Sequence, residues 1–103
     1  MNIMKKLLKL DEVNFTTNLK KSDIIRIAEN YVEGKTEEYE INKTNIIYDA
    51  NSYVVNEPVW YIDVISLKTK KLWPEAYDCL TISDKYGKVV YVMNDHGIVV
   101  EKY

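Results

Sequence analysis

Three side chains in the second half of the chain could in principle do chemistry. The chain has one histidine, His96, and one cysteine, Cys79. His96 could ligate a metal together with Asp95, or it could activate Cys79 as a nucleophile. However, His96 falls within Asn94-Asp95-His96-Gly97, a composition typical of an exposed turn. Cys79 alternates with Leu80 in a predicted strand, where a free cysteine usually acts as a small apolar residue.

Other catalytic or cofactor patterns are missing from the sequence. We find no Gly-rich phosphate loop, no paired carboxylates at a fixed spacing and no Ser/His/Asp arrangement. A single cysteine allows neither an intramolecular disulfide nor a cysteine-rich zinc site. We therefore expect a protein without catalytic activity, metal or cofactor. An enzyme using His96 with Cys79 or Asp95 remains an alternative, and it requires these side chains to meet in a cleft.

Composition and charge are those of a small globular protein. The 103 residues are 47% hydrophobic and 29% charged, which predicts one domain over residues 1–103. The net charge of −2 provides no strong basic face, so we expect no binding of nucleic acid. The apolar run near the start, Leu7-Leu8, is too short for a signal peptide, and no stretch has the length of a membrane span. These features predict a cytoplasmic protein that does not contact a membrane.

One amphipathic helix is expected over residues 22–33. Ser22 is a suitable N-cap, and Gly34 stands where a left-handed terminating residue is expected. The apolar spacing of the segment is that of a helix with one buried face. Residues 1–21 form an N-terminal segment whose first ten residues are compatible with a short helix. The buried stripe is Ile24, Ala28 and Tyr31.

Beyond the helix, the pattern predicts an antiparallel sheet of five to six strands over residues 37–103. Val59–Leu67 is the strongest strand, with Trp60, Ile62 and Val64 on one face. Tyr53-Val54-Val55 is expected to begin another strand, and residues 66–76 to form a lysine-bearing loop. Turns are expected at 84–87 and 94–97, each with a glycine that can adopt positive φ. The predicted fold is α+β, one main helix packed on an antiparallel sheet.

Exposed aromatic and acidic side chains are the candidates for partner binding. Trp73 lies in a long connection, where it either packs on the sheet or serves as a binding anchor. Nine tyrosines are present, and an amphipathic ring suits either an interface or a half-covered sheet face. Three glutamates after the helix either attract a basic partner or only keep a sheet edge charged. The predicted partner-binding residues are Trp73, Tyr61, Tyr86, Tyr91, Glu37, Glu38 and Glu40.

Three stretches of the sequence carry a resemblance to known families. They are Ile-Ile-Arg-Ile-Ala-Glu-Asn-Tyr-Val (24–32), Pro-Val-Trp-Tyr-Ile-Asp-Val (58–64) and Leu-Thr-Ile-Ser-Asp-Lys-Tyr-Gly-Lys-Val-Val-Tyr-Val (80–92). Over residues 22–93 the chain resembles PepSY-type domains and also the small NTF2-fold immunity proteins that neutralise bacterial toxins. Neither resemblance implies a catalytic residue. PepSY-type domains are typically secreted or membrane-tethered, so the short apolar start favours the immunity proteins.

The sequence thus predicts a binding protein, and two kinds remain open. The first is a bacterial immunity protein that binds a cognate toxin domain, with Glu37, Glu38 and Glu40 imitating a nucleic-acid substrate. The second is a PepSY- or NTF2-like module that binds a small ligand or peptide between helix and sheet. This second kind requires a large apolar cavity lined by Trp60 and Tyr31, whereas a packed core there would count against it.

Overall fold

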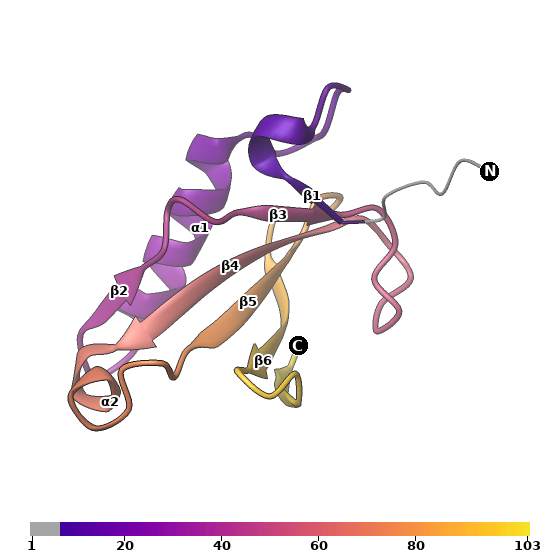
Figure 1. Ribbon diagram of the computed structural model, residues 1–103. Helices are drawn as coiled ribbons and strands as arrows, with labels where there is room; N and C mark the ends of the chain where they lie inside the picture. Colours follow the sequence, from indigo (N-terminus) through magenta and orange to yellow (C-terminus); the bar gives the residue numbers. More distant parts are fainter. Residues whose placement is uncertain (1–6) are drawn as a thin grey trace.

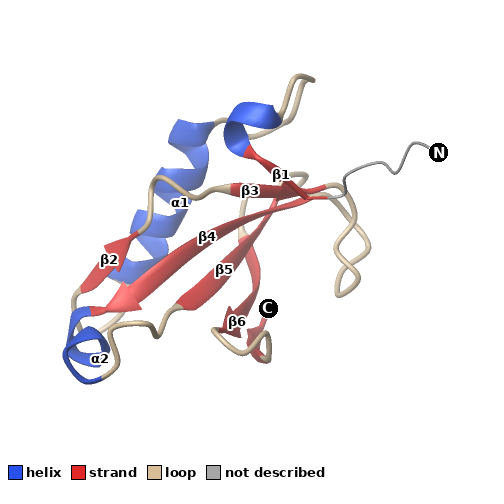
Figure 2. Ribbon diagram, viewed as in Figure 1, coloured by secondary structure: helices blue, strands red, loops and turns tan. Residues whose placement is uncertain are grey.

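A computed structural model describes residues 7–103 as one helix packed on a seven-stranded antiparallel sheet (Figures 1 and 2). A one-turn 3-10 helix and a second short helix, α2, complete the fold, so the predicted α+β class is confirmed. No helix among these residues is both long and apolar enough to cross a membrane. The elements are β1 (Leu7–Lys9), η1 (Leu10–Glu12), α1 (Lys21–Glu33), β2 (Tyr39–Ile41), β3 (Ile47–Asp49), β4 (Val59–Ser66), α2 (Leu67–Leu72), β5 (Asp78–Ser83), β6 (Val89–Asn94) and β7 (Val99–Lys102).

The sheet is organised around β4, its longest strand. The main order is β1-β3-β4-β5-β6-β7, and every pairing is antiparallel. Two short strands share the same edge of β4: β3 pairs with its first half, at Val59, and β2 with its second half, at Val64. A bulge after Thr81 and a second bulge after Val92 shift the register of the last strands. Such bulges increase the local twist of a sheet.

The core lies between α1 and one face of the sheet. Ile24 and Ala28 of α1 are fully buried, as the helical spacing predicts. They pack with alternate residues of the central strands, since successive strand side chains point to opposite faces. The Trp60 ring also lies 5.0 Å from the Tyr48 ring in an edge-to-face contact. The sheet residues in this cluster are Ile46, Tyr48, Trp60, Ile62, Val64, Leu80, Ile82 and Val92.

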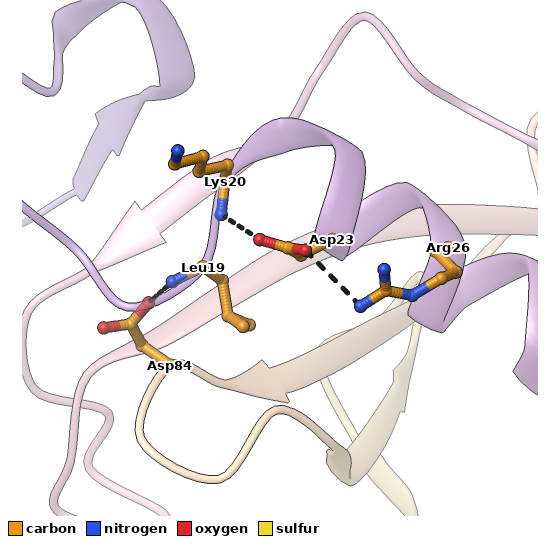
Figure 3. Close-up of polar contacts among 5 residues, drawn as sticks. All are labelled: Leu19, Lys20, Asp23, Arg26 and Asp84. Atoms are coloured by element: carbon orange, nitrogen blue, oxygen red, sulfur yellow. Dashed lines mark hydrogen bonds and ion pairs between the residues drawn. The ribbon is translucent and has the colours of Figure 1, made fainter.

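The main helix ends at Glu33 as predicted, but the structure corrects its start and the expected conformation of Gly34. The helix begins at Lys21, and the N–H of Lys20 donates to Asp23 Oδ2 at 2.8 Å (Figure 3). Asp23 therefore caps the first turn in place of Ser22. Gly34 follows the last turn in a right-handed conformation, with φ −74°, so the expected left-handed terminator is wrong. The two glycines that do adopt positive φ are Gly87 and Gly97, as predicted for the hairpin turns.

Asp84, in the turn after β5, ties the segment before α1 to the sheet. Its Oδ1 accepts a hydrogen bond from the N–H of Leu19 at 2.9 Å (Figure 3). The same oxygen accepts the indole N–H of Trp60, also at 2.9 Å. Its Oδ2 accepts a third bond from the N–H of Asn18 at 3.1 Å. Asp84 is buried, with 7% of its surface exposed. One carboxylate thus connects a core side chain to the entry of the main helix.

Three other predicted elements differ from the structure. The expected short helix at residues 1–10 is replaced at Leu7–Lys9 by strand β1, while residues 1–6 lie outside the described part. Tyr53-Val54-Val55 belongs to a looped segment between β3 and β4, not to a strand. The backbone turns there, because the N–H of Asn56 donates to the carbonyl of Ser52 and the N–H of Ser52 donates to the carbonyl of Glu57. Residues 67–72, expected in a loop, form α2.

A buried polar network lies on the sheet face opposite α1. The hydroxyl of Tyr61 donates to Asp49 Oδ2 at 2.7 Å and lies 3.3 Å from the hydroxyl of Tyr91. The hydroxyl of Tyr91 is also 2.8 Å from Ser52 Oγ. The side chains of Val54 and Val55 pack beside this network. The network therefore fixes the looped segment 50–58 against the sheet.

The hydroxyl of Thr81 is buried beside this network. Thr81 is paired with Tyr61 on one side and Tyr91 on the other, and its Oγ1 has no hydrogen-bond partner among the described residues. A buried hydroxyl without a partner costs about 1–3 kcal/mol. We expect Thr81→Val, which keeps the shape, to raise the free energy of unfolding by about 1 kcal/mol. Urea unfolding measures this; the exposed Thr36→Val is the control, and a destabilised Thr81→Val would contradict the assignment.

Candidate functional site

The connection between β4 and β5 exposes an apolar patch. Ser66 ends β4, and its Oγ accepts the N–H of Thr69, which caps α2. The helix ends at Leu72, and Pro74 prevents it from continuing. Leu72 and Trp73 are 66% and 64% exposed, and Tyr77 is 40% exposed. The three form what we call the α2–β5 patch. Trp73 is therefore exposed and does not pack onto the sheet.

A groove of about 540 Å³ runs beside the patch. Pro74 and Tyr77 line one side, and the ends of β2 and β4 line the other. The strand pairing continues past β2 through the N–H of Asn42, which donates to the carbonyl of Asp63 at 2.9 Å. This pairing sets the floor of the groove. The lining residues are Glu40, Ile41, Asn42, Asp63, Val64, Ile65, Lys70, Pro74, Glu75, Ala76 and Tyr77.

The predicted acidic residues lie next to this groove. Glu37, Glu38 and Glu40 are all exposed at the start of β2 or just before it. The carbonyl of Glu38 accepts the N–H of Leu67 at 3.0 Å, and the Glu40 carboxylate is 2.7 Å from the ammonium of Lys70. These contacts join β2 to α2. The structure thus brings the predicted carboxylates and Trp73 to one end of the molecule, although they are separated by more than thirty positions in the sequence.

Asp63 is a half-buried carboxyl in the groove, paired across the ladder with Cys79. Burial raises the pKa of the Asp63 carboxyl, and a hydrogen bond with Cys79 partly opposes this shift. Burial, followed by the negative charge of Asp63, raises the pKa of the Cys79 thiol well above its ordinary value. The thiol is therefore protonated at neutral pH and is a poor nucleophile.

The pKa shift of Asp63 predicts how stability depends on pH. Its folded-state pKa is above the unfolded value of about 4, so the folded protein binds this proton more tightly. Its contribution to stability is present at low pH and is lost as pH rises through the folded-state pKa. We expect Asp63→Asn to remove this loss, so that the variant gains stability over the original chain between pH 4 and 7. Urea unfolding at several pH values measures this.

Glu38→Gln is the control for that experiment, because Glu38 is exposed and the substitution removes the same charge. Asp78 also has a raised pKa through burial, but it is present in all three proteins and cancels from the comparison. If the stability advantage of Asp63→Asn did not grow with pH, burial would not be disfavouring the charged form of Asp63.

His96 is remote from any catalytic arrangement in the described residues. Its side chain is 78% exposed, and its Nε2 lies 3.9 Å from Asp95 Oδ1, a neighbour in the same turn. The charges that act on the Cys79 thiol come from Asp63 and Asp78, not from His96. Within residues 7–103, no group of three His, Cys, Asp or Glu side chains could hold a metal ion.

The three tyrosines predicted to bind a partner have different environments. Tyr86 is 61% exposed in the β5–β6 turn, with the ammonium of Lys85 5.2 Å from its ring centre. Tyr61 is half-buried in the polar network. Tyr91 faces away from α1, as expected, but it is fully buried because the looped segment 50–58 covers this sheet face. Neither Tyr61 nor Tyr91 lies beside the α2–β5 patch.

Trp60 and Tyr31 do not share the cavity that was predicted between helix and sheet. Trp60 is 1% exposed and packed in the core. Tyr31 is partly buried against this core, and its hydroxyl contacts Tyr103 and Glu101. It lines a groove of about 420 Å³ between α1 and the start of β6, whose lining does not include Trp60.

Sequence reasoning missed several residues of the site. Leu72 and Tyr77 complete the α2–β5 patch, and Asp63 faces the groove. The one available signal was the apolar pair Leu72-Trp73 immediately before Pro74, which indicates a helix end carrying large side chains. The position of Asp63 follows from strand alternation, but its partial burial depends on packing across the ladder.

Comparison of the chain with protein-family models, curated proteins and solved structures finds no match.

Proposed function

We propose that this chain is a non-catalytic domain that binds another protein through the α2–β5 patch. The observation that carries the proposal is the exposure of Leu72 and Trp73, about two-thirds each, beside an open groove. Scattered exposed apolar residues are normal, but here three large ones lie within six positions. Tryptophan and tyrosine are also enriched among the residues that dominate binding energy.

The charges around the patch support a partner with a basic surface. Glu37 and Glu38 are exposed, and Glu75 lies at the groove. Lys70 and Glu40 neutralise each other in an ion pair, and the exposed Lys68 and Lys71 lie in α2. The acidic side of the patch is therefore the one formed by Glu37, Glu38 and Glu75. Complementary charge mainly accelerates encounter, while the buried aromatic residues provide affinity. An apolar cavity surrounded by lysine or arginine is the matching surface.

The specific role that we propose is that of an immunity protein, which occludes the active site of a toxin domain. Support comes from the resemblance of residues 22–93 to NTF2-fold immunity proteins and from exposed carboxylates beside Trp73, which could take the place of substrate phosphates. The small-ligand alternative loses its main support, because Trp60 is packed in the core.

The test is co-expression with the toxin-domain protein encoded by the adjacent gene. We expect a complex that co-purifies through size-exclusion chromatography, together with restored growth of cells producing the toxin. A complex without restored growth would support the binding role and remove the immunity role. The absence of both complex and rescue would remove the toxin-directed proposal.

A further inference from the structure

A second groove, lined by three lysines, lies away from the α2–β5 patch. It has a volume of about 420 Å³ and shares no lining residue with the larger groove. Its lining residues come from the β1–η1 segment, the start of α1 and the β2–β3 connection. We call it the lysine groove. Its lining residues are Lys9, Leu10, Asp11, Lys21, Lys43, Thr44, Asn45 and Ile46.

The ammonium groups of the lysine groove have no partners in the described chain. Neither Lys9, Lys21 nor Lys43 lies within 4 Å of a carboxylate among residues 7–103. Asp11 is the one acidic residue in the lining, so three positive charges face one negative charge. This local excess is opposite in sign to the net charge of −2 of the whole chain. The groove therefore has a net positive charge in the unbound protein.

We infer that the lysine groove binds a small, multiply charged phosphoryl anion. A single carboxylate would neutralise one ammonium and leave two, whereas a phosphate ester or a diphosphate carries enough charge for all three. Lysine is a common phosphate ligand, because its ammonium acts as a point charge with three donors. The hydroxyl of Thr44 and the amide of Asn45 line the same groove and are the neutral polar side chains available to the anion.

The lining also indicates the size and type of the molecule that carries the phosphoryl group. No aromatic side chain lines the groove, so a nucleobase would have no ring on which to stack. Its volume suits a small molecule. A free phosphorylated metabolite therefore fits better than a single-stranded nucleic acid. A phosphorylated lipid headgroup has the same chemistry and is the second source to be tested.

The test uses the full chain and sodium pyrophosphate as the probe. In a titration followed by amide NMR shifts at constant ionic strength, we expect saturable shifts at residues 9–11, 21 and 43–46. We expect each single variant, Lys9→Gln, Lys21→Gln or Lys43→Gln, to weaken binding about threefold, since exposed ion pairs are individually weak. The double variant Lys21→Gln/Lys43→Gln should weaken it about tenfold.

Lys102→Gln is the matched control, because Lys102 is exposed, lies outside the groove and removes the same charge. Equal weakening by Lys102→Gln would overturn the inference, as would shifts that sodium chloride reproduces. Sedimentation with phosphatidylcholine vesicles, with and without phosphatidic acid, distinguishes a free phosphate ester from a lipid headgroup. Pyrophosphate binding without vesicle binding supports a free phosphate ester. Vesicle binding that the lysine variants abolish supports a headgroup, and no binding to either probe rejects the site.

Discussion

Replacement of Asp84 by alanine is expected to cost about 3–5 kcal/mol of the free energy of unfolding. The substitution removes the acceptor of three hydrogen bonds: those from the indole of Trp60 and from the N–H groups of Leu19 and Asn18. The Trp60 indole would then be buried without a partner. Small domains are stable by about 5–15 kcal/mol, so the loss is a large part of the total. Urea unfolding followed by circular dichroism measures it.

Two further variants distinguish this anchor from a general effect of charge. Asp84→Asn keeps one side-chain oxygen as an acceptor, so we expect it to lose less stability than Asp84→Ala. Asp95→Ala removes a carboxylate from the next hairpin turn, where its nearest charged partner is His96 at 3.9 Å, and should change stability by less than about 0.5 kcal/mol. If Asp84→Ala were no worse than Asp95→Ala, the anchoring role would be rejected.

Replacement of Trp73 by alanine is expected to abolish most partner affinity while leaving the fold unchanged. Its side chain is 64% exposed, so truncation removes little from the core. At an interface, loss of a tryptophan anchor typically costs at least about 2 kcal/mol, or roughly thirtyfold in Kd. Isothermal titration calorimetry with the partner found in the co-expression test measures the affinity, and thermal unfolding confirms the fold.

Tyr53→Ala is the control for Trp73→Ala. Tyr53 is also an exposed aromatic residue, 74% accessible, but it lies in the looped segment 50–58, away from the α2–β5 patch. We expect its substitution to leave Kd within about threefold of the original value. Equal affinity of the Trp73→Ala variant and the original chain would place the interface elsewhere and remove the patch as the binding site.

The parts of the fold that were predictable are those governed by short-range patterns. The alternation in Val59–Leu67 placed Trp60, Ile62 and Val64 on one face, and that face packs on α1. The turns at Gly87 and Gly97 were predictable because a tight hairpin requires positive φ. The core positions Ile24 and Ala28 followed from helical spacing. Each of these inferences uses residues only a few positions apart.

Most of the failures concern interactions between distant parts of the chain, whereas the misplaced start of α1 is local. The burial of Tyr91 depends on the looped segment 50–58, which no local pattern places over that sheet face. The start of α1 was misplaced by one residue because two neighbouring polar residues can both serve in the first turn, and the Asp23 carboxylate takes the backbone N–H. The lysine groove joins Lys9, Lys21 and Lys43, whose proximity follows only from the tertiary arrangement.

The bond between Leu19 and Asp84 spans 65 positions, and this separation sets an order of events during protein synthesis. Residues 13–20 leave the ribosome well before the turn that holds them. At about 5–20 residues per second, the delay is several seconds. During that time α1 lacks both its anchor and the sheet face that covers Ile24, so its apolar stripe remains open to chaperones. The turn at Asp84 must therefore be synthesised before the entry of α1 can be anchored.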